Sequence, residues 1–315
     1  MSLNFAGLLK RLPFFLFLAL CLRAEENLHD WSKTPELFPG IKHVFLDTDK
    51  PRTLKINVIQ VDLSRKDLRF MTVDRDPDWG KPMPDFNLPI RVRRRTVHDF
   101  MLEARGRGID MLVAVNATAW SPWRPPYTHI FAAKMGLVIS NGVLVDDPIG
   151  RPVFLITKKN EFQIRDLARN EDLSRIQLAL TGFNLILKDG KVLPPGRSQN
   201  PAPRTAYGLS QGNRYFLIIV VDGRMRWISE GVNTVELGEL MRHFGADVAI
   251  NMDGGGSSTL MVYDGKGGIR QLNKNPFLRR VASSLGIYRV PPDGEKAEGK
   301  KSTSVSKPGT TDKTR

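Results

Sequence analysis

The stretch 248–260 constrains the chain most, because an apolar run ends there at an acid, three glycines and two hydroxyls. Residues 248–252 have the composition of a strand buried between two layers of structure. Asp253 then lies where that strand would leave the core. Glycines let the next turn adopt positive φ and leave its backbone amides open to a ligand. We therefore predict a ligand site formed by Asp253 and the residues after it: Gly254, Gly255, Gly256, Ser257 and Ser258.

A tight hairpin turn, with Asp253 as an ordinary turn residue, is the alternative interpretation of this stretch. Two phosphate-binding motifs are excluded. No lysine follows the glycines, as it would in a P-loop. The acid precedes the glycines and the G-x-G-x-x-G spacing is absent, so the stretch is not a dinucleotide fingerprint.

The charge balance favours an anionic partner. The chain has 47 Lys and Arg against 33 Asp and Glu, a net charge of +14. Nucleic acid, anionic lipid and phosphorylated or acidic glycans all suit such a chain. Zinc-finger spacing and an aromatic-basic ribonucleoprotein motif are missing from the sequence, which makes nucleic acid the weaker option. The single cysteine, Cys21, excludes an intrachain disulfide framework and a Cys-rich metal site.

Four segments are expected along the 315 residues. Residues 1–24 carry two basic residues before an apolar run too short to span a membrane, which is typical of a signal peptide. We therefore expect a periplasmic or secreted protein with no stable membrane span after signal cleavage. Residues 25–50 would form an N-terminal extension and residues 51–290 one catalytic domain. Residues 291–315 have almost no apolar side chains and are expected to be disordered.

The domain itself is predicted to have an α+β fold, with mixed β-sheets flanked by a few helices. Short apolar or alternating runs separated by turn residues predict strands, the first of them at 54–62 and the last at 281–290. Helices are expected after Thr96 and after Asn233, each with an acid three residues on that suits a capping box. Asn141 and Gly142 form a strong hairpin signal between two apolar runs.

One helix–strand plan occurs twice. Each copy has a helix, a glycine, an aspartate two residues later and then a buried strand with a polar end. That polar residue is Asn116 in the first copy and Asp253 in the second, at the same distance from the aspartate. We infer an internal duplication that would present the two side chains at equivalent strand ends, flanking one cleft. Chance is the alternative, since helix–glycine–strand segments are common.

Residues 251–260, with the helix before them, resemble the signature of the phosphodiester glycosidase family. The resemblance spans about residues 54–290. Further short pieces agree with the family in the same order, at residues 115–116, 140–142, 203–206, 221–224 and 280–284. The chain departs from the family at residues 117–119. Family members usually have Asn-Gly-Gly followed by aromatics, whereas this chain has Asn116-Ala117-Thr118-Ala119-Trp120. This departure leaves the identity of the sugar open.

The resemblance implies hydrolysis of the C1–O bond of a sugar-1-phosphodiester, in an exopolysaccharide or cell-envelope glycan. Most glycosidases need two carboxylates, since the leaving alcohol must be protonated. A phosphomonoester needs its charge held more than it needs a proton, so an arginine and backbone amides can replace the acid. Asp253 would then stabilise the oxocarbenium-like centre or activate water, Arg204 would hold phosphate, and Asn116 would bind sugar hydroxyls or water. Further candidates for substrate binding are Gly254, Gly255, Gly256, Ser257, Ser258, Thr205, Asp222, Arg224, Asn273 and Arg280.

No cofactor is expected. A divalent cation such as Ca²⁺ would need Asp222, Asp247 or Asp253, and no loop has calcium-binding spacing. A non-catalytic binding protein for anionic polysaccharide is the alternative function, favoured by the departure at residues 117–118. The carboxylate of Asp253 favours an enzyme, because a pure anion site would avoid a negative charge. A nucleic-acid module is the third option, supported only by the arginines at 91–95.

Overall fold

The computed structural model describes residues 28–50, 52–125, 128–195 and 199–291. The predicted signal peptide, and all of the predicted disordered tail except its first residue, lie outside these residues. Within the described part of the chain, no helix combines the length and apolar character needed to cross a bilayer.

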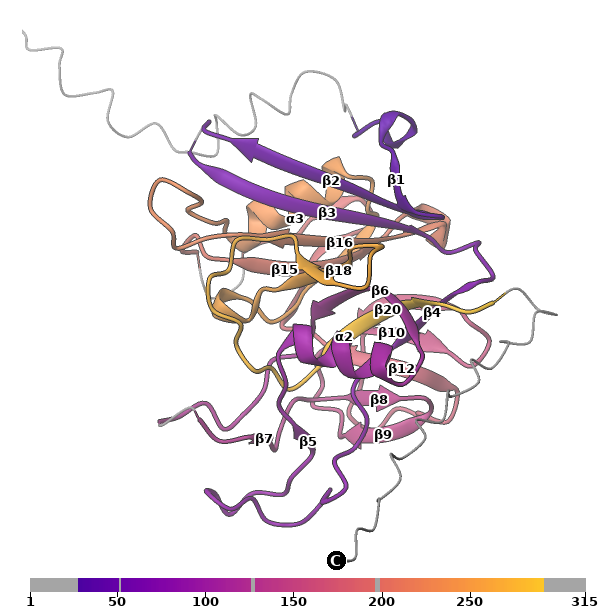
Figure 1. Ribbon diagram of the computed structural model, residues 1–315, viewed down its shortest axis with the longest axis vertical. Helices are drawn as coiled ribbons and strands as arrows, with labels where there is room; N and C mark the ends of the chain where they lie inside the picture. The colour runs from indigo at the N-terminus through magenta and orange to yellow at the C-terminus, as the bar shows by residue number, and fades with distance from the viewer. Residues whose placement is uncertain (1–27, 51, 126–127, 196–198, 292–315) are drawn as a thin grey trace, which may run out of the picture.

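Antiparallel strand pairs build almost the whole fold (Figure 1). The largest sheet has eight strands and contains the strand that leads into Asp253. In spatial order its strands are β1 (Glu36–Phe38), β2 (Ile41–Thr48), β3 (Leu54–Asp62), β16 (Tyr215–Val221), β15 (Arg204–Leu209), β17 (Val248–Asn251), β13 (Asn184–Lys188) and β14 (Lys191–Val192).

Two five-stranded sheets and a two-stranded ribbon complete the structure. The first five-stranded sheet contains β19 (Ile269–Gln271), β18 (Leu260–Tyr263), β6 (Asp110–Asn116), β20 (Ser284–Arg289) and β4 (Leu68–Met71). The second contains β11 (Phe162–Asp166), β10 (Pro152–Thr157), β12 (Ile176–Thr181), β8 (Val138–Ser140) and β9 (Val143–Asp146). The ribbon pairs β5 (Val92–Arg93) with β7 (Phe131–Ala132).

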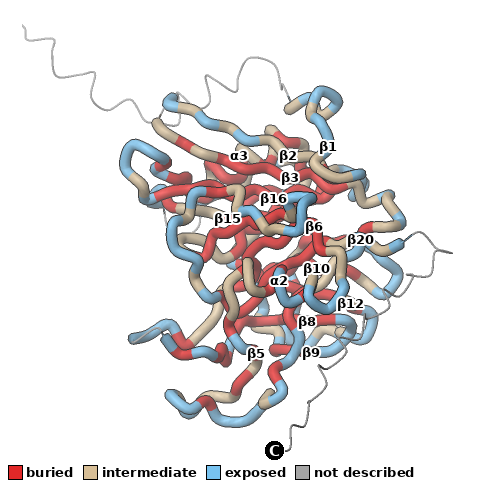
Figure 2. Tube along the Cα trace, viewed as in Figure 1, coloured by how far each residue is buried: buried red, intermediate tan, exposed pale blue. Residues whose placement is uncertain are grey.

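One hydrophobic core joins the three sheets, and the buried segments gather between them in Figure 2. At its centre Phe154 of β10 stacks on Phe216 of β16, with ring centroids 4.8 Å apart. Tyr207 of β15 meets both rings edge-on. Aromatic contacts of this kind add to the stabilisation from area burial alone, so these rings hold the eight-stranded sheet against its neighbour.

In the described part of the chain two α-helices cover the sheets, and both begin where the sequence predicts. In α2 (Val97–Gly106), the Thr96 side chain accepts a hydrogen bond from the Asp99 amide. In α3 (Thr234–His243), Asn233 and Glu236 form a reciprocal capping box, and Glu236 also pairs with Arg52 at 2.6 Å. Helix α2 packs on β6, whereas α3 packs on β13 and β14. The described residues also form three 3-10 turns: η2 (Trp31–Lys33), η3 (Gln211–Asn213) and η4 (Gly255–Ser257).

The predicted α+β class is confirmed, and the strand predicted at 54–62 is β3. The sheets were predicted to be mixed, but all strand pairs of the described residues are antiparallel. Strands β1 and β2, within the expected N-terminal extension, were not predicted. The half-exposed β2 closes the edge of β3 over its whole length. The last strand is shorter than predicted, because residues before Ser284 leave the sheet to contact Arg95, Ala117 and Thr118. The two helix–strand units lie in different sheets, and their common origin stays a prediction.

Candidate active site

The ends of β6 and β17 meet, although the two strands belong to different sheets. The backbone amide of Asp253 donates to the carbonyl of Ala117 at 2.9 Å. The side-chain amide of Asn116 donates to the carbonyl of Asp253 at 2.6 Å. The structure therefore brings together the two polar residues that end the repeated helix–strand plan.

Asn116 is fully buried and its side chain joins three segments. Its Oδ1 accepts hydrogen bonds from the Thr205 hydroxyl at 2.9 Å and from the Thr259 amide at 3.1 Å. The Thr205 hydroxyl also lies 3.2 Å from the hydroxyl of Ser258. Buried polar groups that are satisfied in this way specify one arrangement of the chain. Asn116, Thr205 and Ser258 thus form the base beneath the Asp253 turn.

Asp253 is the titratable group of this site. Its Oδ1 accepts from the Gly254 amide at 3.0 Å, and the Ser257 side chain also hydrogen-bonds to the carboxylate. Burial raises the pKa of Asp253 to about 6, against the lowering influence of Ser257, Arg279 and the Gly254 amide. A carboxyl group with a pKa near neutrality, held beside the cationic Arg279, has the properties of a catalytic group.

Two of the three glycines after Asp253 are required by their surroundings or conformation, and the third lies close to a flexible side chain. A Cβ atom on Gly254 would lie 2.8 Å from the Pro203 carbonyl oxygen, and one on Gly256 would lie 2.4 Å from the Arg279 guanidinium. Gly255 has a φ of +61°, which favours glycine. The amides of Gly254 and Gly255 are already bonded, to the Asp253 carboxylate and to the Pro203 carbonyl. The predicted amide cradle is therefore partly occupied by the protein's own oxygens.

The positive charge at this turn comes from the guanidinium groups of nearby arginines. Arg279 lies against Gly256 and donates to the Ser257 hydroxyl at 3.4 Å, and Arg224 lies over Gly255. Beneath them, buried Arg94 donates to the Arg280 carbonyl at 3.3 Å. Burial, reinforced by Arg280 and Arg279, lowers the pKa of Arg94 to about 10. Such mutual repulsion is relieved by a bound anion.

Arg204, the predicted phosphate ligand, lies at the edge of this cluster. Its Nε donates to the Val232 carbonyl at 3.1 Å and its Nη2 to the Asn200 carbonyl at 3.2 Å. Burial and the nearby Arg224 lower the pKa of Arg204. Much of this guanidinium is therefore engaged with backbone oxygens, which leaves Arg224 and Arg279 closer to the glycine turn.

Asp222 and Asn273, which were predicted to bind substrate, are both buried and hydrogen-bond to each other. The Asn273 side chain donates to Asp222 at 3.0 Å and accepts from the Leu260 amide at 2.9 Å. The Lys274 amide also donates to Asp222 at 2.9 Å. Burial raises the pKa of Asp222. These contacts fix the start of the loop that carries Arg279, while the Arg280 side chain beside it is exposed.

An aromatic wall continues from Arg279. The Arg279 guanidinium lies 4.7 Å from the ring centre of Trp123, which is 53% exposed. Trp123 meets Trp120 edge-on, and Arg94 lies 4.2 Å over Trp120. The sequence showed an aromatic, proline-rich loop here, but nothing in it indicated that Arg279 would meet Trp123.

The arginines at 91–95 do not form one patch. Arg91 pairs with Asp146 at 3.0 Å and Arg95 with Glu103 at 2.9 Å. Arg93 lies 3.7 Å from Asp76, and Arg94 is buried at the site. Across the described ranges, no group of three or more His, Cys, Asp or Glu side chains could hold a metal ion.

The phosphodiester glycosidase family matches this chain over residues 112–288. No curated protein is significantly similar to it in sequence. Among solved structures, the catalytic domain of zebrafish N-acetylglucosamine-1-phosphodiester alpha-N-acetylglucosaminidase, auto-inhibited by its pro-peptide, is 18% identical with a TM-score of 0.57, covering 79% of this chain and 82% of that one. A hypothetical protein from Synechocystis is 13% identical with a TM-score of 0.56, covering 82% and 64%. A candidate exported protein of Burkholderia pseudomallei is 14% identical with a TM-score of 0.51, covering 75% and 74%.

Proposed function

Because this chain belongs to the phosphodiester glycosidase family, we propose that it hydrolyses the C1–O bond of a sugar-1-phosphodiester at the Asp253 turn. One observation carries the proposal. A single partly buried carboxyl group, with its pKa raised to about 6, lies beneath guanidinium groups on a glycine turn. This arrangement suits a reaction that needs one carboxylate at the sugar and several positive charges at the leaving group.

The arginines would hold the phosphate. Arg224 lies against Gly255 and Arg279 against Gly256, and neither has an acidic side chain within ion-pair distance among the described residues. Guanidinium groups bind phosphate oxygens through paired, charge-assisted hydrogen bonds. Positive charge held in place where the leaving group gains negative charge stabilises the transition state directly. Arg204 and Arg280 would extend the positive field at the rim.

Asp253 would act at the sugar carbon. As the C1–O bond breaks, its electron pair leaves with the phosphomonoester and positive charge develops on the ring. The ionised carboxylate of Asp253 stabilises that charge or accepts the proton of the water that attacks C1. With a pKa of about 6, the group is largely ionised at neutral pH. The proton is then released to solvent, and the products are the free sugar and a phosphomonoester.

The departure from the family pattern falls on buried residues. Ala117 and Thr118 are each 1% exposed. The Ala117 carbonyl accepts from Asp253, and the Thr118 amide donates to the Ser283 hydroxyl. These residues hold the turn from below, so sugar contacts would come from the exposed ring of Trp123. An aromatic face beside Arg279 can stack on a sugar ring while the arginine holds its phosphate.

The substrate would be a phosphorylated or anionic glycan outside the cytoplasm, in the cell envelope or an exopolysaccharide. The net charge of +14 and the signal-like residues 1–24 support this assignment. A non-catalytic glycan-binding role is the remaining alternative. Only a turnover measurement distinguishes it from the enzyme, because both would bind the glycan.

The test is turnover of a panel of sugar-1-phosphodiesters by the wild-type protein and by Asp253→Asn. We expect product only from phosphodiesters, and a loss of about 10²–10⁴-fold in the variant, the range attributed to positioned acid–base groups. Circular dichroism should show the variant folded, because the Asp253 side chain is not part of the buried Asn116 network. Binding of panel members without turnover would support the binding protein instead, and full activity in Asp253→Asn would remove this residue from the mechanism.

A further inference from the structure

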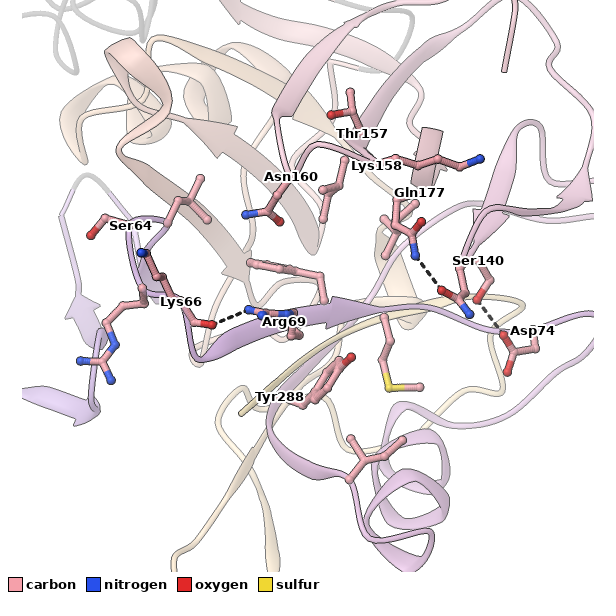
Figure 3. Close-up of a pocket in the computed structure, with 18 of the residues that line it drawn as sticks. Ser64, Lys66, Arg69, Asp74, Ser140, Thr157, Lys158, Asn160, Gln177 and Tyr288 are labelled. Carbon is pink, nitrogen blue, oxygen red and sulfur yellow. Dashed lines mark hydrogen bonds between the residues drawn. The ribbon is translucent and has the colours of Figure 1, made fainter. Parts of the chain in front are cut away.

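A cavity of about 830 Å³ lies away from the Asp253 turn, between β4 and β20 on one side and β10, β12 and β8 on the other (Figure 3). Its size is within the roughly 300–1,000 Å³ of typical ligand sites. Strand β20 runs from beside the Asp253 turn to the cavity. Ser284 pairs with Asn116 at one end of that strand, and Tyr288 lines the cavity four residues further along, about 13 Å away at 3.3 Å per residue.

The cavity is strongly basic. Five of the side chains that line it are cationic and one, Asp74, is acidic. Asp74 accepts a hydrogen bond from the Ser140 hydroxyl at 2.7 Å, and Arg65 is paired with Asp67 at 2.6 Å. Among the described residues, no acidic side chain lies within ion-pair distance of the other four cations, which are Lys66, Arg69, Arg107 and Lys158.

Amide, hydroxyl and aromatic groups accompany these charges. Tyr288 of β20 pairs directly with Arg69 of β4, which places the two side chains on the same face of the sheet. Across the cavity, the Gln177 side chain donates to the Asn141 side chain at 2.6 Å. Asn160 lies in the turn after β10, and these side chains come from both walls in Figure 3.

From this combination we infer that the cavity is a second binding site for an acidic oligosaccharide, separate from the Asp253 turn. Cations with no acidic partner attract carboxylate or phosphate groups. Neutral amides and hydroxyls suit sugar hydroxyl groups, and an aromatic ring suits a sugar face. A simple inorganic anion would use the charges but not the other groups. The site does not depend on the reaction at Asp253.

The experiment measures calorimetric binding of a short galacturonic-acid oligosaccharide at low ionic strength. The test variant is Lys66→Gln/Arg69→Gln/Lys158→Gln. The control is Lys50→Gln/Lys188→Gln/Lys191→Gln, which removes the same charge from exposed positions elsewhere. We expect roughly tenfold weaker binding in the test variant, since each exposed ion pair contributes a factor of about two to five. The control variant and Asp253→Asn should bind as the wild type does.

Thermal unfolding of both triple variants shows that the comparison concerns folded protein. A neutral oligosaccharide of the same length and a single-stranded oligonucleotide are the ligand controls, and weaker binding of both than of the acidic oligosaccharide supports the site. Equal affinity in the test variant and the wild type would overturn the inference, as would an equal loss in the control variant. Loss of binding in Asp253→Asn would place the ligand at the turn, and equal binding of the oligonucleotide would show a general anion surface.

Discussion

The polar residues at the ends of β6 and β17, Asn116 and Asp253, lie side by side but differ in burial and in their effect on stability. Asn116 is fully buried, and its side chain hydrogen-bonds to three different residues. Asp253 is partly exposed, and burial raises the pKa of its carboxyl group to about 6. Satisfied buried groups stabilise a fold, whereas an ionised carboxylate with a raised pKa costs stability. Under the proposed mechanism, one strand end supports the site while the other performs the chemistry.

Among the substitutions compared below, the largest effect is expected from removing a positive charge beside Asp253. Arg279→Gln removes the guanidinium that lies on Gly256 and beside Ser257. We expect kcat to fall by about 10²–10³-fold on a sugar-1-phosphodiester, as for loss of one donor to a developing negative charge. Steady-state kinetics provide the measurement.

Arg280→Gln is the matched control, because it removes the same charge from the next residue, whose side chain is exposed. It should change kcat by less than about tenfold. Equal losses in the two variants would show that only the net positive field matters, not the place of Arg279 on the turn.

Substitution of Asn116 should lower the stability of the protein. Asn116→Ala leaves the Thr205 hydroxyl, the Thr259 amide and the Asp253 carbonyl without their partner. Buried groups left unsatisfied cost about 1–3 kcal/mol each. We therefore expect the free energy of unfolding in denaturant to fall by at least about 2 kcal/mol.

Asn251→Ala is a suitable control, since Asn251 is also a buried strand-end asparagine, at the end of β17. Its side chain makes one long hydrogen bond, to Asn184 at 3.3 Å, and its Oδ1 has no partner among the described residues. If Asn251→Ala lowers the free energy of unfolding as much as Asn116→Ala does, the hydrogen bonds of Asn116 contribute no more to stability than those of another buried asparagine.

The smallest effect is a pH dependence of stability at Asp253. The pKa of this carboxyl group rises from 3.8 to about 6 on folding. The native state therefore keeps the proton that the unfolded state has released between these pH values, and stability falls as pH rises through that window. Two pKa units correspond to about 3 kcal/mol, which solvent screening of a partly exposed group reduces to about 1–2 kcal/mol.

Asp253→Asn removes this titration. Relative to wild type, the variant should gain about 1–2 kcal/mol of unfolding free energy between pH 4 and pH 7 by this linkage. Denaturant unfolding at the two pH values measures the gain. A stability difference that stays constant with pH would mean that Asp253 has an ordinary pKa in the folded protein.

Local features of the fold could be predicted from the sequence because their causes are local. The caps of both helices and the hairpin turn at Asn141, which has positive φ, follow from residue type and spacing. Strands β1 and β2 escaped prediction because an edge strand that is half exposed has no clear alternation.

Apart from the meeting of Asn116 with Asp253, which the repeated helix–strand plan predicted, the site was most predictable where it is continuous in sequence. Asp253 and its glycines form one stretch, so their place on one turn was evident. Arg279 and Arg280 are indistinguishable as neighbouring residues. Which of them reaches Gly256 depends on how Asn273, Lys274 and Asp222 anchor the loop. In the same way, Arg94 joins the site through tertiary packing, because it lies over Trp120, which meets Trp123, and Trp123 in turn lies against Arg279.

The most direct test of the central claim is hydrolysis of a sugar-1-phosphodiester in ¹⁸O-labelled water, with both products analysed by mass spectrometry. If Asp253 acts at the sugar carbon while the arginines hold the departing phosphate, the C1–O bond breaks and the label enters the free sugar. Label in the phosphomonoester would show cleavage of the phosphorus–oxygen bond and would contradict the account.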